Sequence, residues 1–448
     1  MATVDTVIIS VLKGMAAPND VYYVQDPSNP GFDGLFYYQP LPISIDDNND
    51  VTVIFDSTTT PGPKRFVRDY NGFINVRWFG ALGNNSVSTL AFQAAIEFIT
   101  TNIIPPPPTP LPIPPYNGGR GGTLFIPAGQ YTIDDTLQIV KDMNHSSTKI
   151  NIVLDAGVQI FNTASVLFNV TGEVYFSLTG SQQGSSEIWE MVDYSEEHLS
   201  AYTIQMVNTG IAVRNWGRIQ NISFIGNNNG QTAIRAENFP TGIFESNSFR
   251  GYKNYNIYTE KCWGSKFINN FHGNMSTSVN GYACIAVGDS SATLFSGERF
   301  ECETCPGIQF FKINGALGGN GILISECAFE PCSIGIDVAA NPDTVLNSLL
   351  IQSCYFEGCD PINIQGAANG LKHKNIEINS CTVAESGSLG KSSTINDVEL
   401  LTISNTNHPI TINIGSTVKN FANSMNNFKD SGGIDKLNNI AFNTITTP

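Results

Sequence analysis

Hydrophobic residues recur along the chain at intervals longer than any single strand. "ISECAFEPC" (residues 324–332) and "IQSCYFEGC" (residues 351–359) place Ile, Cys, Phe, Glu and Cys in the same slots, 27 residues apart. Anchored on the aromatic slot, the series has spacings of 25, 22, 29, 29, 27 and 27 residues: Phe224, Phe249, Phe271, Phe300, Phe329, Phe356 and Val383. A period of this length indicates a solenoid.

Two further columns accompany the anchors. Five residues before most anchors stand large apolar residues: Ile219, Phe244, Phe295, Ile324, Ile351 and Ile378, with Lys266 breaking the series and Phe267 one place late. Two residues before the anchors stand Asn247, Asn269, Cys327, Cys354 and Cys381. On a strand, residues two apart share a face and residues five apart do not, so a bend must separate the columns. Each repeat is predicted to be strand, tight polar turn, strand and looser loop, stacked as a parallel β-solenoid.

Composition supports an all-β fold. Only 14% of residues are charged, whereas Gly (41) and Phe (27) are abundant, a mix that favours strands and turns. The formal net charge of -16 disfavours binding to nucleic acid. Because no apolar run reaches about 18 residues and the start has no basic region, we expect no membrane insertion and no signal peptide. Synthesis in a cytoplasm is expected.

The cysteines follow the repeat. All nine lie between Cys262 and Cys381, an odd number in a long chain, so we expect reduced, buried thiols rather than a disulfide framework. The two-residue gap in "CETC" (Cys302 and Cys305) suits a metal knuckle. Because the other cysteines recur with the repeat, the prediction is that the chain holds no metal site and needs no cofactor.

Two segments resemble a known family. "INVRWFGALGNNSVSTLAFQAAIEFI" (residues 74–99) followed by "GGTLFIPAGQYTI" (residues 121–133) resembles the opening of the pectate-lyase-like right-handed parallel β-helix of phage tailspikes. The upstream residues are similar to the region that precedes such helices in phage tail proteins. The resemblance implies a virion tail protein directed at host surface polysaccharide, in contact with other virion tail proteins, and a homotrimer. The expected domains are an attachment region (1–75), the right-handed β-helix (76–397) and a short C-terminal β element (398–448).

The chain also departs from the family pattern. The family usually carries acidic residues where this chain has Asn84, Asn85, Ser88 and Thr89. This difference argues against a catalytic activity inherited from the family. Ser88 or Thr89 can still cap a short helix formed by "LAFQAAIEFI" across the end of the solenoid. The Pro-rich run at residues 103–122 is expected to be a stiff exposed spacer.

Both ends of the chain carry patterns of their own. Apolar residues at the front share one face of a predicted helix that would pack on other copies, on a virion socket or on the next segment of the same chain: Val4, Val7, Ile8, Val11 and Leu12. At the back, "ELLTISNTNHPITINIGSTV" (residues 399–418) is predicted to form a hairpin, followed by an Asn-rich tail.

Candidate catalytic residues follow three of the anchors. Because Phe points inward on a strand, its neighbour points outward, so Glu301, Glu330 and Glu357 should form a surface ladder. Adjacent and alternate rungs would separate carboxyls by about 5 and about 10 Å, which bracket the two glycosidase arrangements. One carboxyl of such a close pair would have a raised pKa. The alternative is a set of solvated carboxylates neutralised by neighbours.

A second candidate surface is "SSEIWEMVDYSEEHLSAY" (residues 185–202). Trp189 and Tyr194 beside Glu190 and Asp193 suit a sugar ring, which is apolar on one face and hydroxylated at its edge. The alternative is an amphipathic helix that covers the solenoid. The sequence leaves three functions open: a polysaccharide depolymerase, a receptor-binding spike without catalysis, and a purely structural tail or collar component.

Overall fold

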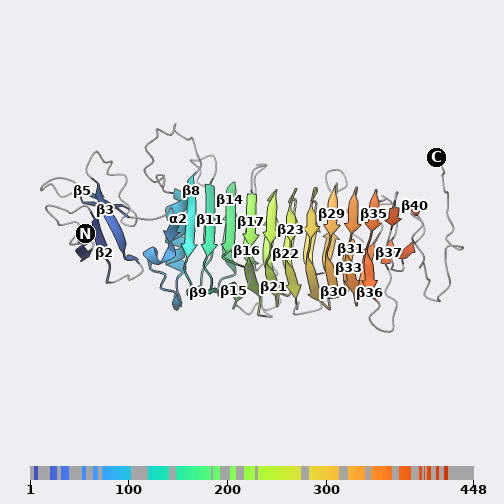
Figure 1. The fold of residues 1–448 in the computed structure, drawn as a ribbon, viewed down its shortest axis with the longest axis horizontal. Coiled ribbons are helices and arrows are strands. Elements are labelled where there is room, and N and C mark those ends of the chain that lie inside the picture. The colour runs from blue at the N-terminus through green and yellow to red at the C-terminus, as the bar shows by residue number, and fades with distance from the viewer. Residues whose placement is uncertain are drawn as a thin grey trace, which may run out of the picture.

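The structure is a computed structural model of the chain, in which stacked coils of parallel strands form an elongated solenoid (Figure 1). It describes residues 5–8, 21–27, 32–39, 53–56, 64–68, 73–101, 120–140, 148–182, 185–191, 202–207, 216–227, 231–273, 282–311, 321–338, 345–365, 373–384, 393–395, 398, 401–404, 410–412 and 418–421. The predicted all-β parallel β-helix with one short helix near the N-terminus is confirmed.

Three sheets run the length of the solenoid, and each full coil contributes one strand to each of them in turn. The first sheet has 13 strands among the described residues: β6 (Phe73–Asn75), β8 (Arg120–Ile126), β11 (Thr148–Leu154), β14 (Val174–Gly180), β17 (Trp216–Gln220), β20 (Gly242–Glu245), β23 (Lys266–Ile268), β26 (Leu294–Ser296), β29 (Ile322–Ser325), β32 (Leu349–Gln352), β35 (Ile376–Asn379), β38 (Leu401–Ser404) and β40 (Val418–Phe421).

The second sheet has 11 strands within the same residues: β7 (Asn84–Val87), β9 (Gly129–Ile133), β12 (Val158–Asn162), β15 (Ser186–Glu190), β18 (Ile222–Ile225), β21 (Ser248–Arg250), β24 (Phe271–Gly273), β27 (Arg299–Cys302), β30 (Ala328–Cys332), β33 (Tyr355–Glu357) and β36 (Thr382–Ala384). The third sheet also has 11 described strands: β10 (Leu137–Val140), β13 (Val166–Thr171), β16 (Tyr202–Val207), β19 (Thr232–Glu237), β22 (Tyr255–Glu260), β25 (Ala283–Gly288), β28 (Ile308–Phe311), β31 (Ile334–Val338), β34 (Asp360–Ile364), β37 (Ser393–Ile395) and β39 (Ile410–Ile412).

The third sheet corrects the two-strand repeat expected from the sequence. Its strands occupy the stretch of each repeat that was predicted to be a looser loop. Ile285, Ile308, Ile336 and Ile362 stack in register on its inner face and are fully buried. The connection that precedes each of these strands varies in length, so an alignment anchored on Phe does not bring their apolar residues into one column.

The predicted aromatic ladder forms on the second sheet with one correction. Phe224, Phe249, Phe300, Phe329 and Phe356 are fully buried and lie in one register column. Between Phe249 and Phe300 the column is occupied by His272, whereas the predicted Phe271 is only half-buried. The His272 ring stacks on both neighbours, at centroid distances of 5.1 and 4.8 Å.

The same shift explains the irregular first column. Phe267 pairs with Phe244 on one side and with Phe295 on the other, and Lys266 points outward. Phe267 and His272 are five residues apart, as in the other repeats, so this coil keeps the internal spacing and is displaced by one residue. Placing the anchor on Phe271 was therefore wrong by one position.

The predicted bend is a left-handed residue between the first and second sheets. Positive φ values of 53–66° recur three residues before the ladder column, at Asn221, Ser246, Asn269, Gly297, Glu326, Ser353 and Ser380. Residues with small or locally hydrogen-bonding side chains tolerate this conformation best, and most of these positions carry them. The bend turns the chain so that the residue two positions before it and the residue directly after it both point into the core, as Ile351 and Cys354 do around Ser353.

A buried polar network occupies the column two residues before the ladder. The Asn247 side chain donates to the Ile219 carbonyl at 2.8 Å and to Asn270 Oδ1 at 3.1 Å, and Asn270 Nδ2 donates to Glu298 Oε1 at 3.0 Å. His272 Nε2 lies 3.0 Å from Glu298 Oε2, and both side chains are fully buried. The imidazole thus supplies a partner for a carboxylate that has lost its hydration.

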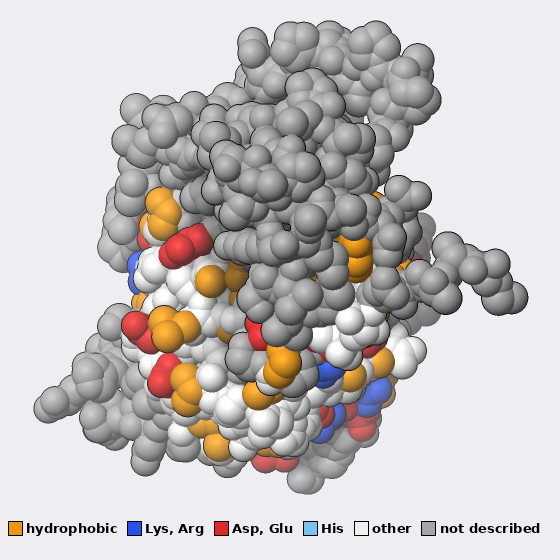
Figure 2. Space-filling view, turned by 90° about the vertical axis from the view of Figure 1, so that its left-hand side faces the viewer, with side chains coloured by type: hydrophobic (Ala, Val, Ile, Leu, Met, Phe, Trp, Pro, Cys, Tyr) orange, Lys and Arg blue, Asp and Glu red, His pale blue; other side chains and the backbone are white. Residues whose placement is uncertain are grey.

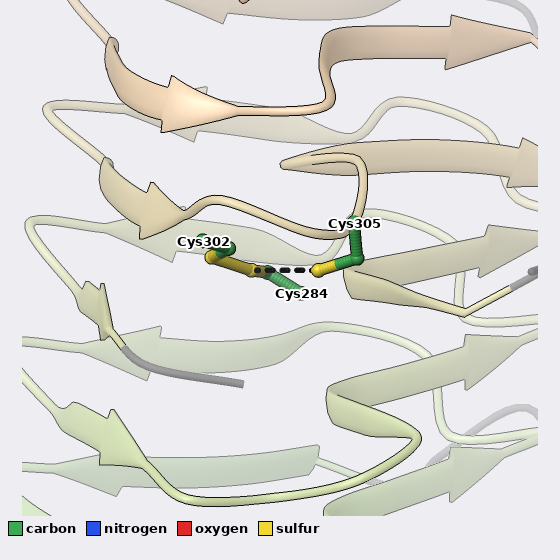
Figure 3. Close-up of side chains that lie close together, drawn as sticks. All are labelled: Cys284, Cys302 and Cys305. Atoms are coloured by element: carbon green, nitrogen blue, oxygen red, sulfur yellow. Dashed lines mark hydrogen bonds between the residues drawn. A yellow bond between two sulfur atoms is a disulfide. The ribbon is translucent and has the colours of Figure 1, made fainter. Parts of the chain in front are cut away.

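In the next three coils the same column contains cysteines. Cys327, Cys354 and Cys381 are 1% exposed, and the thiols of the latter two donate to Ile324 and Ile351 carbonyls of the preceding coil at 3.8 Å. All nine cysteines are buried and seven are free thiols, as expected. The expectation that all are reduced is wrong: Cys284 and Cys302 form a disulfide (Figure 3). Coil stacking brings this pair together.

One helix covers the N-terminal end of the solenoid. Helix α2 (Thr89–Thr101) packs its buried Phe92, Ile96 and Ile99 against the first coils, where it contacts β8, β10 and β11. Ser88 lies directly before it, and its carbonyl accepts from the Phe92 amide at 3.0 Å. The helix closes the hydrophobic channel that the first coil would otherwise expose to water.

A separate five-stranded sheet precedes the solenoid. Its order is β1 (Asp5–Ile8), β2 (Val21–Gln25), β3 (Gly34–Gln39), β5 (Lys64–Arg68) and β4 (Val53–Asp56). The predicted N-terminal helix is wrong where it can be tested: Val7 and Ile8 lie in β1, paired in parallel with β2, while Val4, Val11 and Leu12 lie outside the described residues. The apolar residues serve a sheet because a partner strand is available.

Arg68 joins this sheet to the β-helix. Its guanidinium lies over the rings of Phe32, Phe36 and Trp78 at 4.3, 4.5 and 4.3 Å, and it donates to the Phe32 carbonyl at 2.7 Å. Burial lowers the pKa of Arg68, and the three aromatic faces offset part of that desolvation. Trp78 belongs to the 3-10 helix η3 (Val76–Phe79), so the contact couples the two parts of the chain.

The C-terminal hairpin expected between residues 399 and 418 does not form. Strand β38 pairs in parallel with β35 and β40, and β39 pairs in parallel with β37. The two apolar segments therefore extend the stacked sheets beyond residue 397, because each finds an open strand edge on the preceding coil. Residues 103–119 of the Pro-rich run and the tail from residue 422 lie outside the described residues. The last three residues of the run, 120–122, belong to strand β8, so the spacer prediction is wrong for them.

The described N-terminal end shows hydrophobic side chains scattered among polar ones (Figure 2). Leu82, Val87 and Leu90 are exposed there, Leu90 to 85%. Among the described residues, no helix is long and apolar enough to cross a membrane.

Phe329→Ala should lower the free energy of unfolding by about 3–5 kcal/mol, because it removes a ring stacked on two neighbours at 4.8 and 4.9 Å. Denaturant unfolding followed by circular dichroism measures the change. Glu330→Gln, on the outer face of the same strand, is the control and should stay within about 0.5 kcal/mol of the original chain. Equal midpoints for the two variants would contradict the ladder's role.

His272→Phe should destabilise the protein although it completes the aromatic ladder, because it leaves the Glu298 carboxylate buried without its imidazole partner. Leaving a buried polar group without its hydrogen-bond partner costs about 1–3 kcal/mol. Adding Glu298→Gln removes the charge, so the double variant should be more stable than His272→Phe alone. Thermal unfolding of both variants and of Glu298→Gln completes the cycle, and a double variant less stable than His272→Phe would refute the pairing.

Candidate functional site

The predicted glutamate ladder lies on the outer face of the second sheet. Glu301, Glu330 and Glu357 are half-buried and directed away from the core, as expected. Arg299 Nη2 lies 2.7 Å from Glu301 Oε1 and 3.6 Å from Glu330 Oε2, and the Tyr355 hydroxyl donates to Glu357 Oε2 at 2.8 Å. Each carboxylate therefore has a partner from its own sheet, which is the arrangement of the non-catalytic alternative. A catalytic role for these residues stays a prediction.

The second predicted surface is divided between the two faces of β15. Trp189 points outward, donates from Nε1 to Glu187 Oε2 at 2.9 Å and packs on Phe161 of the preceding coil. Glu190 lies inside, 2% exposed, and accepts from Asn162 Nδ2 at 2.9 Å. Glu190 was predicted to contact a sugar. In the structure its side chain instead forms a hydrogen bond between its own coil and the preceding one.

The rest of that surface gives a mixed result. Residues 186–190 form a strand, so the alternative of an amphipathic helix is wrong for them. Asp193 and Tyr194 lie outside the described residues. Among the described residues of that surface, Trp189 lies on the outer face of β15, and Tyr202, its last residue, lies in β16 of the third sheet.

A larger aromatic surface lies on the outer face of the third sheet, where the sequence analysis placed only loops. We call it the third-sheet strip, formed by Tyr202, Arg235, Glu237, Tyr255, Tyr258, Glu260, Tyr282 and Phe311. All eight side chains are half-buried, so each presents part of its surface to solvent. They come from strands β16, β19, β22 and β28 and from Tyr282, directly before β25, so they span five consecutive coils.

Arg235 is the centre of the third-sheet strip. Its guanidinium lies 4.8 Å from the Tyr202 ring centroid and 5.9 Å from that of Tyr258, and it donates to the Tyr202 hydroxyl at 2.5 Å. It also forms an ion pair with Glu237. Burial alone would lower the pKa of Arg235, but the hydrogen bond to Glu237 raises it overall. The cation is therefore held in a fixed position between aromatic faces.

The tyrosine rings form a contiguous surface around this cation. Ring centroids are separated by 5.5 Å for Tyr255 and Tyr258, 5.2 Å for Tyr255 and Tyr282, and 5.2 Å for Tyr258 and Phe311. Burial raises the pKa of Tyr255 to about 12, and burial followed by the Glu260 charge raises that of Tyr258. Their hydroxyls are thus protonated near neutral pH and can donate hydrogen bonds.

Beyond the strip the same sheet carries a ladder of amides and one carboxylate, in which Gln309 and Asp337 are buried and Asn363 and Gln365 are half-buried. Gln309 Nε2 donates to Asp337 Oδ2 at 3.1 Å, Asn363 Nδ2 donates to Asp337 Oδ1 at 2.7 Å, and Gln365 Nε2 donates to Asn363 Oδ1 at 2.6 Å. Gln309, Asp337 and Asn363 occupy the same register column as Arg235 and Tyr258. Aromatic and hydrogen-bonding groups therefore follow one line along the solenoid.

A signal for the strip was present in the sequence. "TAIRAE" (residues 232–237) and "YNIYTE" (residues 255–260) align at an offset of 23 residues, with Ile and Glu in the same slots. The offset differs from the dominant 27 because the connections between strands in these two coils differ in length. An alignment anchored on the Phe residues does not reveal this similarity.

Comparisons with known proteins give the fold and no family. No family model matches the chain, and no curated protein matches it. Among solved structures, ORF18 of Geobacillus virus E2 is 14% identical with a TM-score of 0.48, covering 93% of this chain and 74% of that chain. The tailspike protein gp49 of Acinetobacter baumannii bacteriophage Fri1, a capsular polysaccharide depolymerase, is 10% identical with a TM-score of 0.48, covering 93% and 76%.

Structures of other kinds are similar as well. The surface adhesin PfbA of Streptococcus pneumoniae is 14% identical with a TM-score of 0.44, covering 77% of this chain and all of its own. The stacked parallel strands make the chain a parallel β-helix, and the structures similar to it include phage tailspikes, bacterial adhesins and enzymes. Sites grafted on the fold, rather than the fold, must decide between these functions.

Proposed function

We propose that the protein is a virion tail or spike protein of a bacteriophage that binds host surface polysaccharide through the third-sheet strip. The observation that carries the proposal is the contiguous surface of Tyr202, Tyr255, Tyr258 and Phe311 around Arg235. Aromatic faces pack on the apolar face of a sugar ring, while fixed hydroxyl, guanidinium and carboxylate groups bond its edge. The resemblance of residues 74–99 and 121–133 to the tailspike β-helix supports the virion role.

The charge of the protein selects the class of glycan. The whole chain has a net charge of -16, and the one arginine of the strip already pairs with Glu237. A polyanionic glycan would meet repulsion across the surface, whereas a neutral one would not. We therefore propose a neutral host polysaccharide, running along the third sheet from the third-sheet strip toward Asn363 and Gln365.

The remaining parts of the proposal concern assembly. We propose that residues 1–75 attach the spike to other virion tail proteins, that the chain functions as a homotrimer in the virion tail, and that it is made in the cytoplasm of the host. The N-terminal sheet, joined to the solenoid by Arg68, is a separate layer suited to such a contact. A purely structural tail or collar role is the outcome if no glycan binds.

A second candidate function, cleavage of the bound glycan, is favoured by one observation within the strip. Glu237 and Glu260 are register partners on adjacent coils, one paired with Arg235 and the other accepting from the Tyr258 hydroxyl at 3.0 Å. Neighbouring strands are about 4.8 Å apart, close to the carboxylate separation of about 5–5.5 Å in retaining glycosidases. The competing catalytic prediction is the ladder of Glu301, Glu330 and Glu357.

Tyr258→Ala should weaken binding of neutral host polysaccharide by about tenfold or more, because it removes a ring from the centre of the strip. Isothermal titration or surface plasmon resonance with purified host glycan measures this. Trp189→Ala, on the second sheet, is the matched control and should bind as the original chain does. The reverse result, loss with Trp189→Ala only, would move the glycan site to β15.

If the protein cleaves its glycan, Glu260→Gln should reduce the rate by at least about a hundredfold while leaving binding in place. Release of new reducing ends from the neutral glycan is the measurement. Glu330→Gln keeps shape and removes a comparable outward charge, so it should cleave at the original rate. Loss of cleavage with Glu330→Gln instead would assign catalysis to the second-sheet glutamates, and no product from the original chain would leave binding as the function.

A further inference from the structure

Three buried cysteines outside both surfaces form a cluster that the repeat does not explain. Cys284, Cys302 and Cys305 are 0, 1 and 3% exposed, and their sulfur atoms all lie within 4.8 Å of one another (Figure 3). Cys284 and Cys302 are joined by the disulfide, and Cys305 is a free thiol whose Sγ lies 3.9 Å from that of Cys284. The disulfide accounts for two of the three cysteines. Cys305 is a third sulfur beside it, and three is the number of protein ligands in many metal sites.

The fold holds the cluster in place from two adjacent coils. Cys284 lies in β25, and its amide donates to the Pro306 carbonyl of the next coil at 2.9 Å. Cys302 ends β27, and the Cys305 amide donates to the Cys302 carbonyl at 3.4 Å, which closes the turn between them. Backbone hydrogen bonds therefore position all three cysteines independently of any bond between sulfurs.

We propose that Cys284, Cys302 and Cys305, when reduced, bind one thiophilic cation such as Zn²⁺ or Cu⁺. Thiolates at about 2.3 Å from a tetrahedral zinc ion stand about 3.8 Å apart, and the sulfurs of Cys284 and Cys305 are already 3.9 Å apart. The Cα atoms of Cys284 and Cys302 are 7.3 Å apart, beyond the usual disulfide range of about 4.4–6.8 Å. A cation between the two sulfurs spans that separation.

The chemistry balances with one named reductant. A thiol or phosphine reductant supplies two electrons and is itself oxidised, and two protons are taken up as the Cys284–Cys302 bond opens to two thiols. Binding of Zn²⁺ then displaces three thiol protons, leaving a site of net charge -1. Three protein ligands leave one position of a tetrahedral ion for an exchangeable ligand. Glu303 and Thr304, exposed in the turn, mark the side from which an ion can enter.

The other cysteines of the chain provide the contrast. Cys327, Cys354 and Cys381 contribute one thiol per coil to a single column, and Cys354 and Cys381 donate to backbone carbonyls. The cluster instead takes sulfurs from two columns and joins them across a tight turn. Soft thiolate ligands select Zn²⁺ or Cu⁺ over the hard cations that carboxylates bind.

The test uses the full chain, reduced with a phosphine under anaerobic conditions and incubated separately with Zn²⁺ and Cu⁺. After removal of unbound ion, elemental analysis should find one equivalent of at least one cation per chain. Cys305→Ser, which keeps the disulfide pair, should weaken binding at least tenfold. Cys381→Ser is the matched control, an equally buried thiol outside the cluster, and should bind as the original chain does.

Two further measurements keep the proposal refutable. Co²⁺ should give a thiolate charge-transfer band in the original chain and in Cys381→Ser, and a weaker one in Cys305→Ser. Chain that was never reduced should bind no cation, because two of the three ligands are then in the disulfide. Absence of both cations from reduced chain, equal binding by Cys305→Ser and Cys381→Ser, or binding without reduction would each overturn the site. Circular dichroism confirms that each variant is folded.

Discussion

The stacking of one coil on the next, at about 4.8 Å per strand, is the constraint on which the rest of the structure depends. It places equivalent residues of successive repeats in direct contact, so each inward position must suit its copies above and below. Phe300, Phe329 and Phe356 satisfy this demand with nearly parallel rings. Gly307 and Gly335 meet the same requirement because they have no side chain. A Cβ at these positions would lie 2.7 and 2.6 Å from the rings of Phe329 and Phe356.

The same constraint explains the polar and sulfur-containing residues of the core. A buried side chain in a column can bond to the coil before it or after it, as Asn270 does with the Phe244 carbonyl and with Glu298. Glu298 is tolerated because Asn270 and His272 meet its oxygens from the adjacent coil. Where the column carries cysteines, weak bonds to carbonyls suffice, and where cysteines of two columns meet, a disulfide and a third thiol result.

Outside the core, stacking turns single residues into extended surfaces. Outward residues at one register position form a line along the solenoid, as Arg235, Tyr258, Gln309, Asp337 and Asn363 do on the third sheet. An elongated polymer can contact such a line at several coils at once. Its affinity then comes from several weak contacts together. The second sheet carries a comparable line of glutamates, which contact Arg299 and Tyr355 of the same sheet.

The sequence by itself determined the repeat, the inward Phe and Cys columns, the bend and the helix that closes the end, because these depend on local periodicity. Only the tertiary structure decided which residue of a displaced coil enters the ladder, His272 or Phe271, since hydrogen bonds to Glu298 and Asn256 outweigh the match in residue type. It also decided that Glu190 is inside, that strands β38, β39 and β40 extend the stack, and that Cys284 meets Cys302. Those outcomes depend on which residues of adjacent coils become neighbours. Because the loops differ in length, the sequence separation between such residues varies, and a local pattern does not reveal it.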